Sequence, residues 1–273
     1  TARDDRAFYE GWAFLIEDGI VSDMGPQKDL TAKYSASDKL ALHDHIVCPG
    51  LINCHNHAAM KLMRGLGQGL NLDDWLQQAI WPFEKEHLDA PTVGLGAELA
   101  IVEMLMSGIT TFSDMYFFPE TVASVAERLG LNVQLAVPII SLDTRWARGS
   151  EECLHRALAL HDLYRDHQHV SVSFGPHSVE ALDLETLEKI GMYADELDLG
   201  IQIHLQETSG ELDRALKKHG HSFVVLLKKI GLMNERLQVV HAVHLTSEDK
   251  AILAETNANV IHCPSSNLLL GSG

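Results

Sequence analysis

The sequence predicts an α/β fold, because short apolar runs rich in β-branched residues alternate with helical patterns along most of the chain. The expected strands are residues 47–53, 109–114, 132–139, 170–174, 200–205, 237–241 and 259–263. Helical patterns lie between most of them, at residues 91–107, 119–129, 151–166, 184–197, 223–230 and 247–256. Strands interleaved with helices in this way indicate repeated βαβ units and a parallel sheet.

Two architectures fit this alternation, an open doubly wound sheet and a closed (β/α)8 TIM barrel. The first expected strand is not followed by the Gly-x-Gly-x-x-Gly pattern of dinucleotide-binding sheets, since Gly65-Leu-Gly-Gln-Gly69 has a different spacing. We therefore predict a TIM barrel, with seven strands present, over residues 49–273. Chemistry in such barrels lies at the C-terminal ends of the strands, which gives a test for each candidate residue.

Residues 1–48 are predicted to form the N-terminal part of a small β-sandwich domain. Residues 12–24 read as two short strands joined by Asp18-Gly19, a pair typical of a two-residue hairpin turn. From residue 26 to residue 45 we expect an irregular segment that leads into the first barrel strand.

Composition narrows the classes of partner. The chain has 273 residues, of which 46% are hydrophobic and 22% charged, which is ordinary for a folded domain. It lacks a run of about 18 apolar residues and begins without a signal pattern, so we expect a cytoplasmic protein with no membrane partner. The net charge of −17 disfavours nucleic acid as a partner, because phosphate backbones reward clustered Lys and Arg. Small neutral or cationic molecules are the expected partners.

The histidines carry more information than the four cysteines, which form no Cys-x-x-Cys pair and indicate neither a zinc finger nor a redox dithiol. His55 and His57 end the first barrel strand. The strand period of two points both imidazoles to one face while Asn56 faces away. Two such imidazoles can share a divalent cation, although two ordinary polar residues at a strand end would look the same.

Two further strands end in candidates of the same kind. His204 closes the strand 200–205, and Glu207 follows three residues later. A metal lowers the pKa of bound water from about 15.7 towards about 7, and a nearby carboxylate that is not a ligand can then move the proton. The alternative is a half-buried histidine beside a solvated glutamate. His241 closes a later strand, where it could orient water or stabilise negative charge.

His177 occupies the matching place after an earlier strand, in Gly175-Pro-His-Ser178, whereas His244 lies further into a loop and is expected to be structural. Five histidines therefore fall at the ends of four predicted strands: His55, His57, His177, His204 and His241. Because these strand ends meet at one mouth of a barrel, the histidines jointly predict a metal site.

Taken in order, these motifs resemble the amidohydrolase superfamily and, within it, the 5-methylthioadenosine/S-adenosylhomocysteine deaminases. The segments that carry the resemblance are residues 49–57, 60–65, 75, 80–84, 175–178 and 204–208 and the strand that ends at His241. The resemblance extends from the hairpin near residue 12 to the last residue. Triazine hydrolases and guanine or cytosine deaminases share the metal motifs, so the motifs specify the superfamily more sharply than the substrate.

The resemblance implies roles for the histidines. His55, His57 and His204 would be metal ligands. Glu207 would carry a proton between metal-bound water and a ring nitrogen, and His241 would hold the attacking hydroxide or the developing charge. One zinc ion per subunit is expected, with iron or manganese as alternatives, because imidazole ligands with an open water position suit these metals.

The resemblance also implies a substrate. Glu84 and His177 would grip a nucleoside, Glu84 by accepting hydrogen bonds from ribose hydroxyls, and Arg148 loosely matches an arginine of the family. The expected reaction is hydrolytic deamination of 5-methylthioadenosine, S-adenosylhomocysteine or adenosine to the inosine analogue and ammonia, by a homo-oligomer. The alternatives are an amidohydrolase acting on a chlorotriazine, guanine or cytosine ring, and a catalytically silent metal-binding homologue. Glu84 disfavours the first and the intact histidines disfavour the second.

The sequence departs from the family pattern at its end. Family members supply a fourth metal ligand, an aspartate on the eighth strand, and this chain ends at Leu270-Gly-Ser-Gly273. A barrel of seven strands has two unpaired edges, so we expect a fragment of a longer chain, incomplete at its C-terminus. Asp114 ends the second strand, and we expect it to have a structural hydrogen-bonding role instead of replacing the missing ligand.

Overall fold

The computed structural model describes residues 9–273, and the chain divides into two compact units between Pro49 and Gly50. The first unit contains an antiparallel hairpin of β1 (Trp12–Glu17) and β2 (Ile20–Pro26). Asp18 and Gly19 join the strands with φ angles of 50° and 78°, as the expected two-residue turn requires. The hairpin is therefore confirmed, and the larger β-sandwich of which it would be a part stays a prediction.

One helix of the first unit, α1 (Gln27–Lys33), corrects the expectation of an irregular segment after residue 26. Lys33 Nζ and Tyr34 Oη both donate to Asp23 Oδ2 at 2.8 Å, so β2 holds the end of the helix. Asp29 in the first turn and Lys33 in the last turn also suit the helix dipole. These tertiary bonds to Asp23 have no periodic signature in the sequence.

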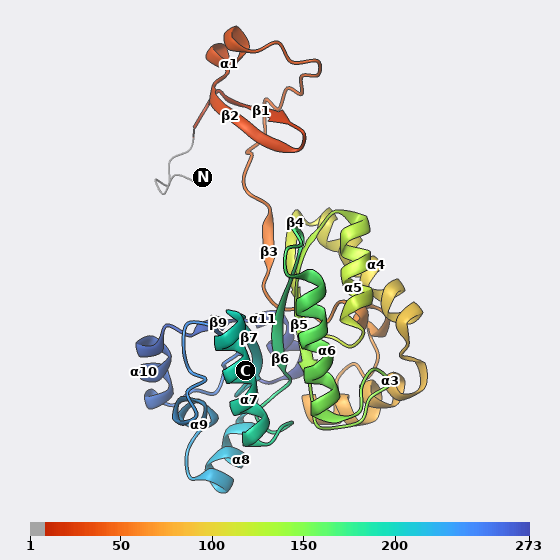
Figure 1. Cartoon of the computed structure of the whole chain (residues 1–273), viewed down its shortest axis with the longest axis vertical. Helices are drawn as coiled ribbons and strands as arrows, with labels where there is room; N and C mark the ends of the chain where they lie inside the picture. The colour runs from red at the N-terminus through yellow and green to blue at the C-terminus, as the bar shows by residue number, and fades with distance from the viewer. Residues whose placement is uncertain (1–8) are drawn as a thin grey trace. The chain divides into compact units, whose positions relative to one another are not determined.

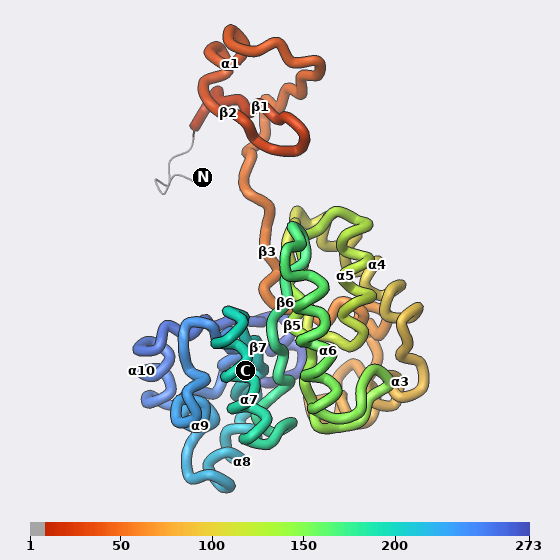
Figure 2. The backbone as a smooth tube through the Cα atoms, in the orientation of Figure 1, coloured from red at the N-terminus to blue at the C-terminus, as the bar shows by residue number. Residues whose placement is uncertain are grey.

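The second unit is a curled parallel sheet with helices packed on its outer face (Figures 1 and 2). Each strand pairs with the next along the chain, in the order β3-β4-β5-β6-β7-β8-β9, which confirms the predicted seven strands of an α/β barrel. The strands are β3 (Leu51–Asn53), β4 (Ile109–Asp114), β5 (Asn132–Ile139), β6 (Val170–Pro176), β7 (Ile201–Leu205), β8 (Leu237–His241) and β9 (Asn259–Ile261).

The first of these strands is shorter than expected, because it begins at Leu51 instead of residue 47. Pro49 has no N–H to give to a ladder, which is one reason for the late start. Gly50 lies so close to β4 that a Cβ added there would be 2.0 Å from Thr110 Oγ1. The Pro-Gly step therefore brings the backbone against β4 just before the two histidines of the first strand.

Helices follow most strands and cover the sheet from outside. Each predicted helix has an observed counterpart. One helix of 11 residues, α8 (Ser209–His219), was not predicted, and the other unpredicted helical elements have at most seven residues. The helical elements are η1 (Ala58–Met63), α2 (Leu72–Trp75), η2 (Leu76–Ile80), α3 (Trp81–His87), α4 (Ala90–Met106), α5 (Pro119–Leu129), α6 (Gly149–Tyr164), α7 (Leu184–Leu197), α8 (Ser209–His219), α9 (Phe223–Lys229), α10 (Ser247–Thr256) and α11 (Pro264–Leu270). Within residues 9–273, no helix is long and apolar enough to cross a membrane.

Local signals set the helix starts. Asp89 and Asp183 accept from the backbone N–H groups of Thr92 and Thr186, as side chains at the N-cap position do. Thr246 forms a reciprocal capping box with Asp249 at the start of α10. Each cap satisfies N–H groups that the helix cannot pair itself, so these helices begin where the sequence predicts.

Strand β7 shows how the sheet presents polar groups to its interior. Ile201, Ile203 and Leu205 are at most 2% exposed and alternate with Gln202 and His204. Because strand side chains point to opposite faces in turn, the three apolar residues pack on one face while Gln202 and His204 share the other. The inner face of this strand therefore carries an amide and an imidazole at successive levels.

Candidate metal centre and proton-transfer site

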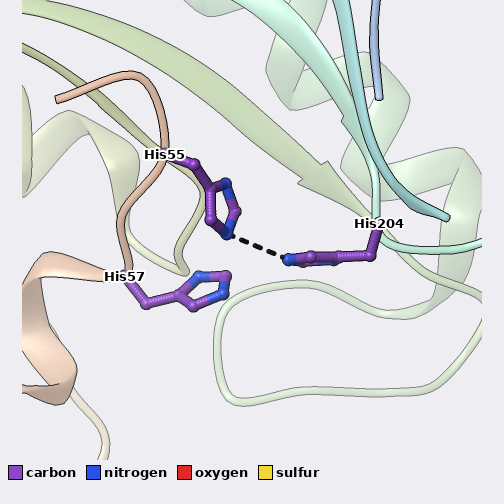
Figure 3. A group of neighbouring side chains, drawn as sticks. All are labelled: His55, His57 and His204. Carbon is purple, nitrogen blue, oxygen red and sulfur yellow. Dashed lines mark hydrogen bonds between the residues drawn. The ribbon is translucent and has the colours of Figure 1, made fainter. Parts of the chain in front are cut away.

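Three imidazoles converge at the C-terminal ends of two strands that lie far apart in the sequence. His55 and His57 follow β3, and His204 lies in β7 (Figure 3). One ring nitrogen from each residue lies within 4.8 Å of the other two, and Nε2 of His55 is 3.1 Å from Nε2 of His204. In the part of the chain that the structure describes, this is the one cluster of three or more histidine, cysteine or acidic side chains with metal-like spacing.

The other nitrogen of each ring contacts an oxygen that can only accept a hydrogen bond. The contacts are His55 Nδ1 to Gln202 Oε1 at 2.7 Å, His57 Nδ1 to the Met115 carbonyl at 2.5 Å and His204 Nδ1 to the His177 carbonyl at 2.7 Å. Each neutral ring must therefore carry its proton on Nδ1 and a lone pair on Nε2. This arrangement fixes the tautomer of a metal-binding histidine.

The donor set fits a divalent metal ion. Burial lowers the pKa of all three imidazoles, and neighbouring histidines add to the effect at His55 and His204. A proton shared between the two Nε2 atoms is therefore disfavoured, and two lone pairs 3.1 Å apart repel each other. A cation bound by these nitrogens would remove the repulsion between the lone pairs without a proton. Neutral imidazoles are common ligands of zinc and related metals.

A carboxylate and a fourth imidazole lie beside this cluster. Glu207 is 7% exposed, and its Oε2 is 3.4 Å from Nε2 of His241. His241 is 6% exposed, and its ring centroid is 5.6 Å from that of His204 and 6.1 Å from that of His55. Burial, followed by the charge of Glu211, raises the pKa of Glu207 to about 7. A carboxyl with this pKa can accept and release a proton near neutral pH.

His241 is neutral and has the opposite tautomer to the three clustered histidines. Asn267 Nδ2 donates to His241 Nδ1 at 3.2 Å, which leaves the ring proton on the Nε2 that faces Glu207. Burial lowers the pKa of His241 to about 4, so the contact joins a neutral imidazole to the glutamate. The backbone at His241 and Ala242 has φ angles of 72° and 49°, a region that residues other than glycine rarely adopt and that is enriched at functional sites.

Glu211 holds in place the backbone segment that carries Glu207. Glu211 was not among the site residues predicted from the sequence. Its two carboxylate oxygens accept from the backbone N–H groups of Gln206 and Glu207, each at 2.9 Å. The residue is 8% exposed and lies in the first turn of α8, where the Thr208 side chain accepts from its N–H. The pattern Thr208-Ser-Gly-Glu211 is the signature of a helix start, so it could have predicted both α8 and this residue.

The end of β4 connects the histidine cluster to Glu84. Asp114 Oδ1 accepts from the backbone N–H of Ala58, and the next residue, Met115, supplies the carbonyl that holds His57. Tyr116 then donates from its hydroxyl to Glu84 Oε1 at 2.6 Å. Burial raises the pKa of Glu84 by more than the hydrogen bond from Tyr116 lowers it. Burial also raises the pKa of Asp114, to about 7. Tyr116 was not among the residues predicted to form the site.

The two remaining candidates differ in position: His177 lies against the histidine cluster, and Arg148 is exposed. The ring centroid of His177 is 4.8 Å from that of His204, and burial lowers the pKa of His177 to about 4. Arg148 is exposed at the start of α6, where its backbone N–H donates to Glu152 Oε2 at 2.9 Å. In the part of the chain that the structure describes, no hydrogen bond joins the guanidinium of Arg148 to the histidine cluster. A role for this arginine stays a prediction.

Comparison with known proteins agrees with this geometry. The model of the amidohydrolase family matches residues 46–273. A 5-methylthioadenosine/S-adenosylhomocysteine deaminase of Saccharophagus degradans is 40% identical over 265 residues, which are 97% of this chain and 59% of the relative. The crystal structure of a Xanthomonas campestris adenosine deaminase with bound zinc has a TM-score of 0.94 and 35% identity, covering 97% of this chain and 60% of that one.

The likeness to a more distant neighbour shows the fold alone. The zinc complex of an atrazine chlorohydrolase from Arthrobacter aurescens has a TM-score of 0.76 at 22% identity, over 82% of this chain and 55% of that one. The chain thus spans about 60% of the length of the curated relatives that it matches.

Proposed function

The chain belongs to the amidohydrolase family, and we propose that it carries the metal centre and proton-transfer groups of a zinc-dependent deaminase of adenine nucleosides. The substrates would be 5-methylthioadenosine, S-adenosylhomocysteine or adenosine. Two findings support this substrate class: the name of the relative that is 40% identical, and the likeness to an adenosine deaminase with bound zinc at 35% identity.

The observation that carries the proposal is a buried carboxylate that lies close to the three convergent imidazoles but does not belong to the metal-ligand cluster. Glu207 approaches His241 at 3.4 Å, and His241 in turn lies beside the rings of His55 and His204. His55, His57 and His204 would hold the zinc ion. The ion would supply Lewis acidity, which allows water to ionise near neutral pH.

Glu207 would transfer the protons of the reaction. Deamination adds water to the ring carbon that bears the exocyclic amine, protonates a ring nitrogen and then breaks the C–N bond, so that ammonia leaves and a carbonyl forms. With a pKa of about 7, Glu207 can take a proton from water and deliver it to the ring nitrogen. His241, with its ring N–H on the side of Glu207, would donate to the oxygen as negative charge develops there.

Residues around the histidine cluster would hold the nucleoside. Glu84 would accept hydrogen bonds from the ribose hydroxyls, and the hydroxyl of Tyr116 keeps its carboxylate in place at 2.6 Å. His177 would contact the base, since its ring lies against that of His204. Arg148 would contribute at the sugar substituent only after moving its exposed side chain towards the site.

A substrate panel tests the proposal. The zinc-loaded protein is incubated with adenosine, 5-methylthioadenosine, S-adenosylhomocysteine, guanine and a chlorotriazine, and the release of ammonia or chloride is followed. We expect ammonia from the adenosine derivatives alone, released about 10²- to 10⁴-fold more slowly by the Glu207→Gln variant. Turnover of guanine or of the chlorotriazine would replace the nucleoside proposal with another ring. No product from any compound would favour a metal-binding homologue without catalytic activity.

A further inference from the structure

We propose that Gln202 is a positioning residue for the metal centre: its side-chain oxygen holds the proton of His55 on Nδ1 and thereby presents Nε2 to the metal. Gln202 was not among the residues predicted to form the site. The proposal rests on the proposed metal site and is independent of the substrate.

Gln202 reaches His55 from the strand that also supplies another ligand. It is fully buried in β7, two residues before His204, so both side chains lie on the inner face of the sheet. Its Oε1 is 2.7 Å from His55 Nδ1 across 147 residues of sequence. One strand therefore provides one ligand directly and sets the orientation of a second.

The orientation of the Gln202 amide follows from its other contacts. Its Nε2 lies 3.1 Å from the Cys54 carbonyl oxygen, 3.1 Å from Ser113 Oγ and 2.7 Å from Gln238 Oε1. A carbonyl oxygen can only accept, so a rotated amide would place two acceptors against each other at Cys54. Oε1 must therefore face His55. Because this oxygen cannot donate, the neutral imidazole has its proton on Nδ1 and its lone pair on Nε2.

The surrounding side chains hold the amide in this orientation. Ser113 Oγ donates to Gln134 Oε1 at 3.0 Å, which leaves its lone pairs free to accept from Gln202. Together with Gln238 these residues form a polar layer across four strands, β4, β5, β7 and β8. The interior of such a barrel is usually filled by bulky branched apolar residues, which would avoid the cost of burying amides. The fold alone therefore does not call for an amide at position 202.

Gln202 also differs from the groups that hold the other two ligands. His57 and His204 bond to backbone carbonyls, of Met115 and His177, which stay in place when side chains change. His55 is the clustered histidine whose Nδ1 partner is a side chain. Substitution at position 202 can thus remove the support of one ligand and leave the support of the other two intact.

The test measures zinc affinity by competition with a chromophoric chelator, without any substrate. We expect Gln202→Met to bind zinc about 10- to 100-fold more weakly than the parent protein, the usual effect of losing the partner of a ligating histidine. The matched control is Gln134→Met, which removes the amide of the same layer that accepts from Ser113 Oγ and so lies one residue further from His55 than the partners of Gln202. Its zinc affinity should equal that of the parent. Circular dichroism and thermal unfolding check that both variants fold.

A second variant separates positioning from packing. Gln202→Glu keeps an oxygen that accepts from His55 Nδ1, so we expect its zinc affinity to return to near the parent value. It has no N–H for the Cys54 carbonyl, so we expect it to unfold at a lower temperature than the parent protein. Nitrogen NMR of histidine-labelled protein gives an independent readout, because the Nδ1–H form of His55 should persist in Gln202→Glu and be lost in Gln202→Met.

Several outcomes would overturn the proposal. It fails if Gln202→Met and Gln134→Met weaken zinc binding equally, if Gln202→Glu binds as weakly as Gln202→Met, or if zinc affinity is unchanged in all variants. It also fails if neither variant at position 202 folds, since Gln202 would then be a structural residue. A parent protein that binds no zinc would instead overturn the metal site itself, and this proposal with it.

Discussion

The clustered histidines and His241 lie side by side and differ in which ring nitrogen is held. In His55, His57 and His204, Nδ1 contacts an oxygen that accepts, so Nε2 presents a lone pair to the cluster. In His241, Nδ1 instead receives a hydrogen bond from Asn267, so Nε2 carries a proton towards Glu207. Residues of one chemical type therefore become potential metal ligands or a hydrogen-bond donor according to the group behind the ring.

Removal of one clustered imidazole should have the largest effect and tests this distinction directly. In His204→Ala we expect zinc affinity to fall by more than the roughly 10- to 100-fold typical of losing a ligand's supporting group, and turnover to be lost with the metal. In His241→Ala the zinc affinity should stay close to that of the parent, because the Nε2 of His241 carries a proton. Chelator competition measures both. An equal loss of zinc in the two variants would contradict the distinction.

The next largest effect is expected at the proton-transfer carboxylate. Glu207→Gln should lower kcat by about 10²- to 10⁴-fold, because an amide cannot accept and return the proton. Zinc content, measured by atomic absorption, should not change. Glu188→Gln, on the exposed side of α7, is the matched control and should keep full activity. Near-normal turnover by Glu207→Gln would remove Glu207 from the mechanism.

A smaller effect is expected on the side of the site that would hold the sugar. Tyr116→Phe removes the hydroxyl that donates to Glu84. A hydrogen bond to a charged group contributes about 1.5–3 kcal/mol, so we expect KM to rise about 10-fold or more with a smaller change in kcat. Tyr193→Phe, on α7, is the control. A fall in kcat at constant KM would show that Tyr116 acts on the chemistry and not through Glu84.

The smallest effect is a change in pH dependence. Glu207 must be ionised to accept a proton, so kcat/KM should fall as the pH drops through the pKa of Glu207, which burial and Glu211 raise to about 7. Glu211→Gln removes a neighbouring negative charge and makes ionisation of Glu207 easier. It also removes one of the two oxygens that accept from the backbone of Gln206 and Glu207, which should lower the height of the profile and not its position. The acidic limb of the pH profile should therefore move to lower pH, on the order of one unit. An unchanged profile, or a shift to higher pH, would exclude this coupling.

Much of the fold could be predicted because its signals are local. The spacing of apolar residues within each segment distinguishes strands from helices and depends only on neighbouring residues. Asp18-Gly19 specifies the hairpin turn by its backbone preference. Helix α1 was missed, since bonds from Lys33 and Tyr34 to Asp23 support it. Helix α8 was missed although Thr208-Ser-Gly-Glu211 is a recognisable start signal.

The site was predicted in part for the same reason. His55, His57 and His204 could be found because strand ends of a parallel barrel meet at one mouth. Gln202 and Tyr116 could not be found as supporting groups, because each acts on a residue of another element and an amide or a phenol in such a place has no motif of its own. Glu211 was missed although the helix-start pattern Thr208-Ser-Gly-Glu211 indicates it.

By itself the sequence determined the α/β alternation, the hairpin and the placement of histidines and Glu207 at strand ends, because periods of 2 and 3.6 residues are read along a single segment. Only the tertiary structure decided which nitrogen of each ring is free, how deeply Glu207 is buried and which carboxylate raises its pKa. These properties depend on groups brought together by folding, such as His55 and Gln202, which are 147 residues apart. Hydrogen bonding and desolvation are set by distance in space, which the order of residues does not encode locally.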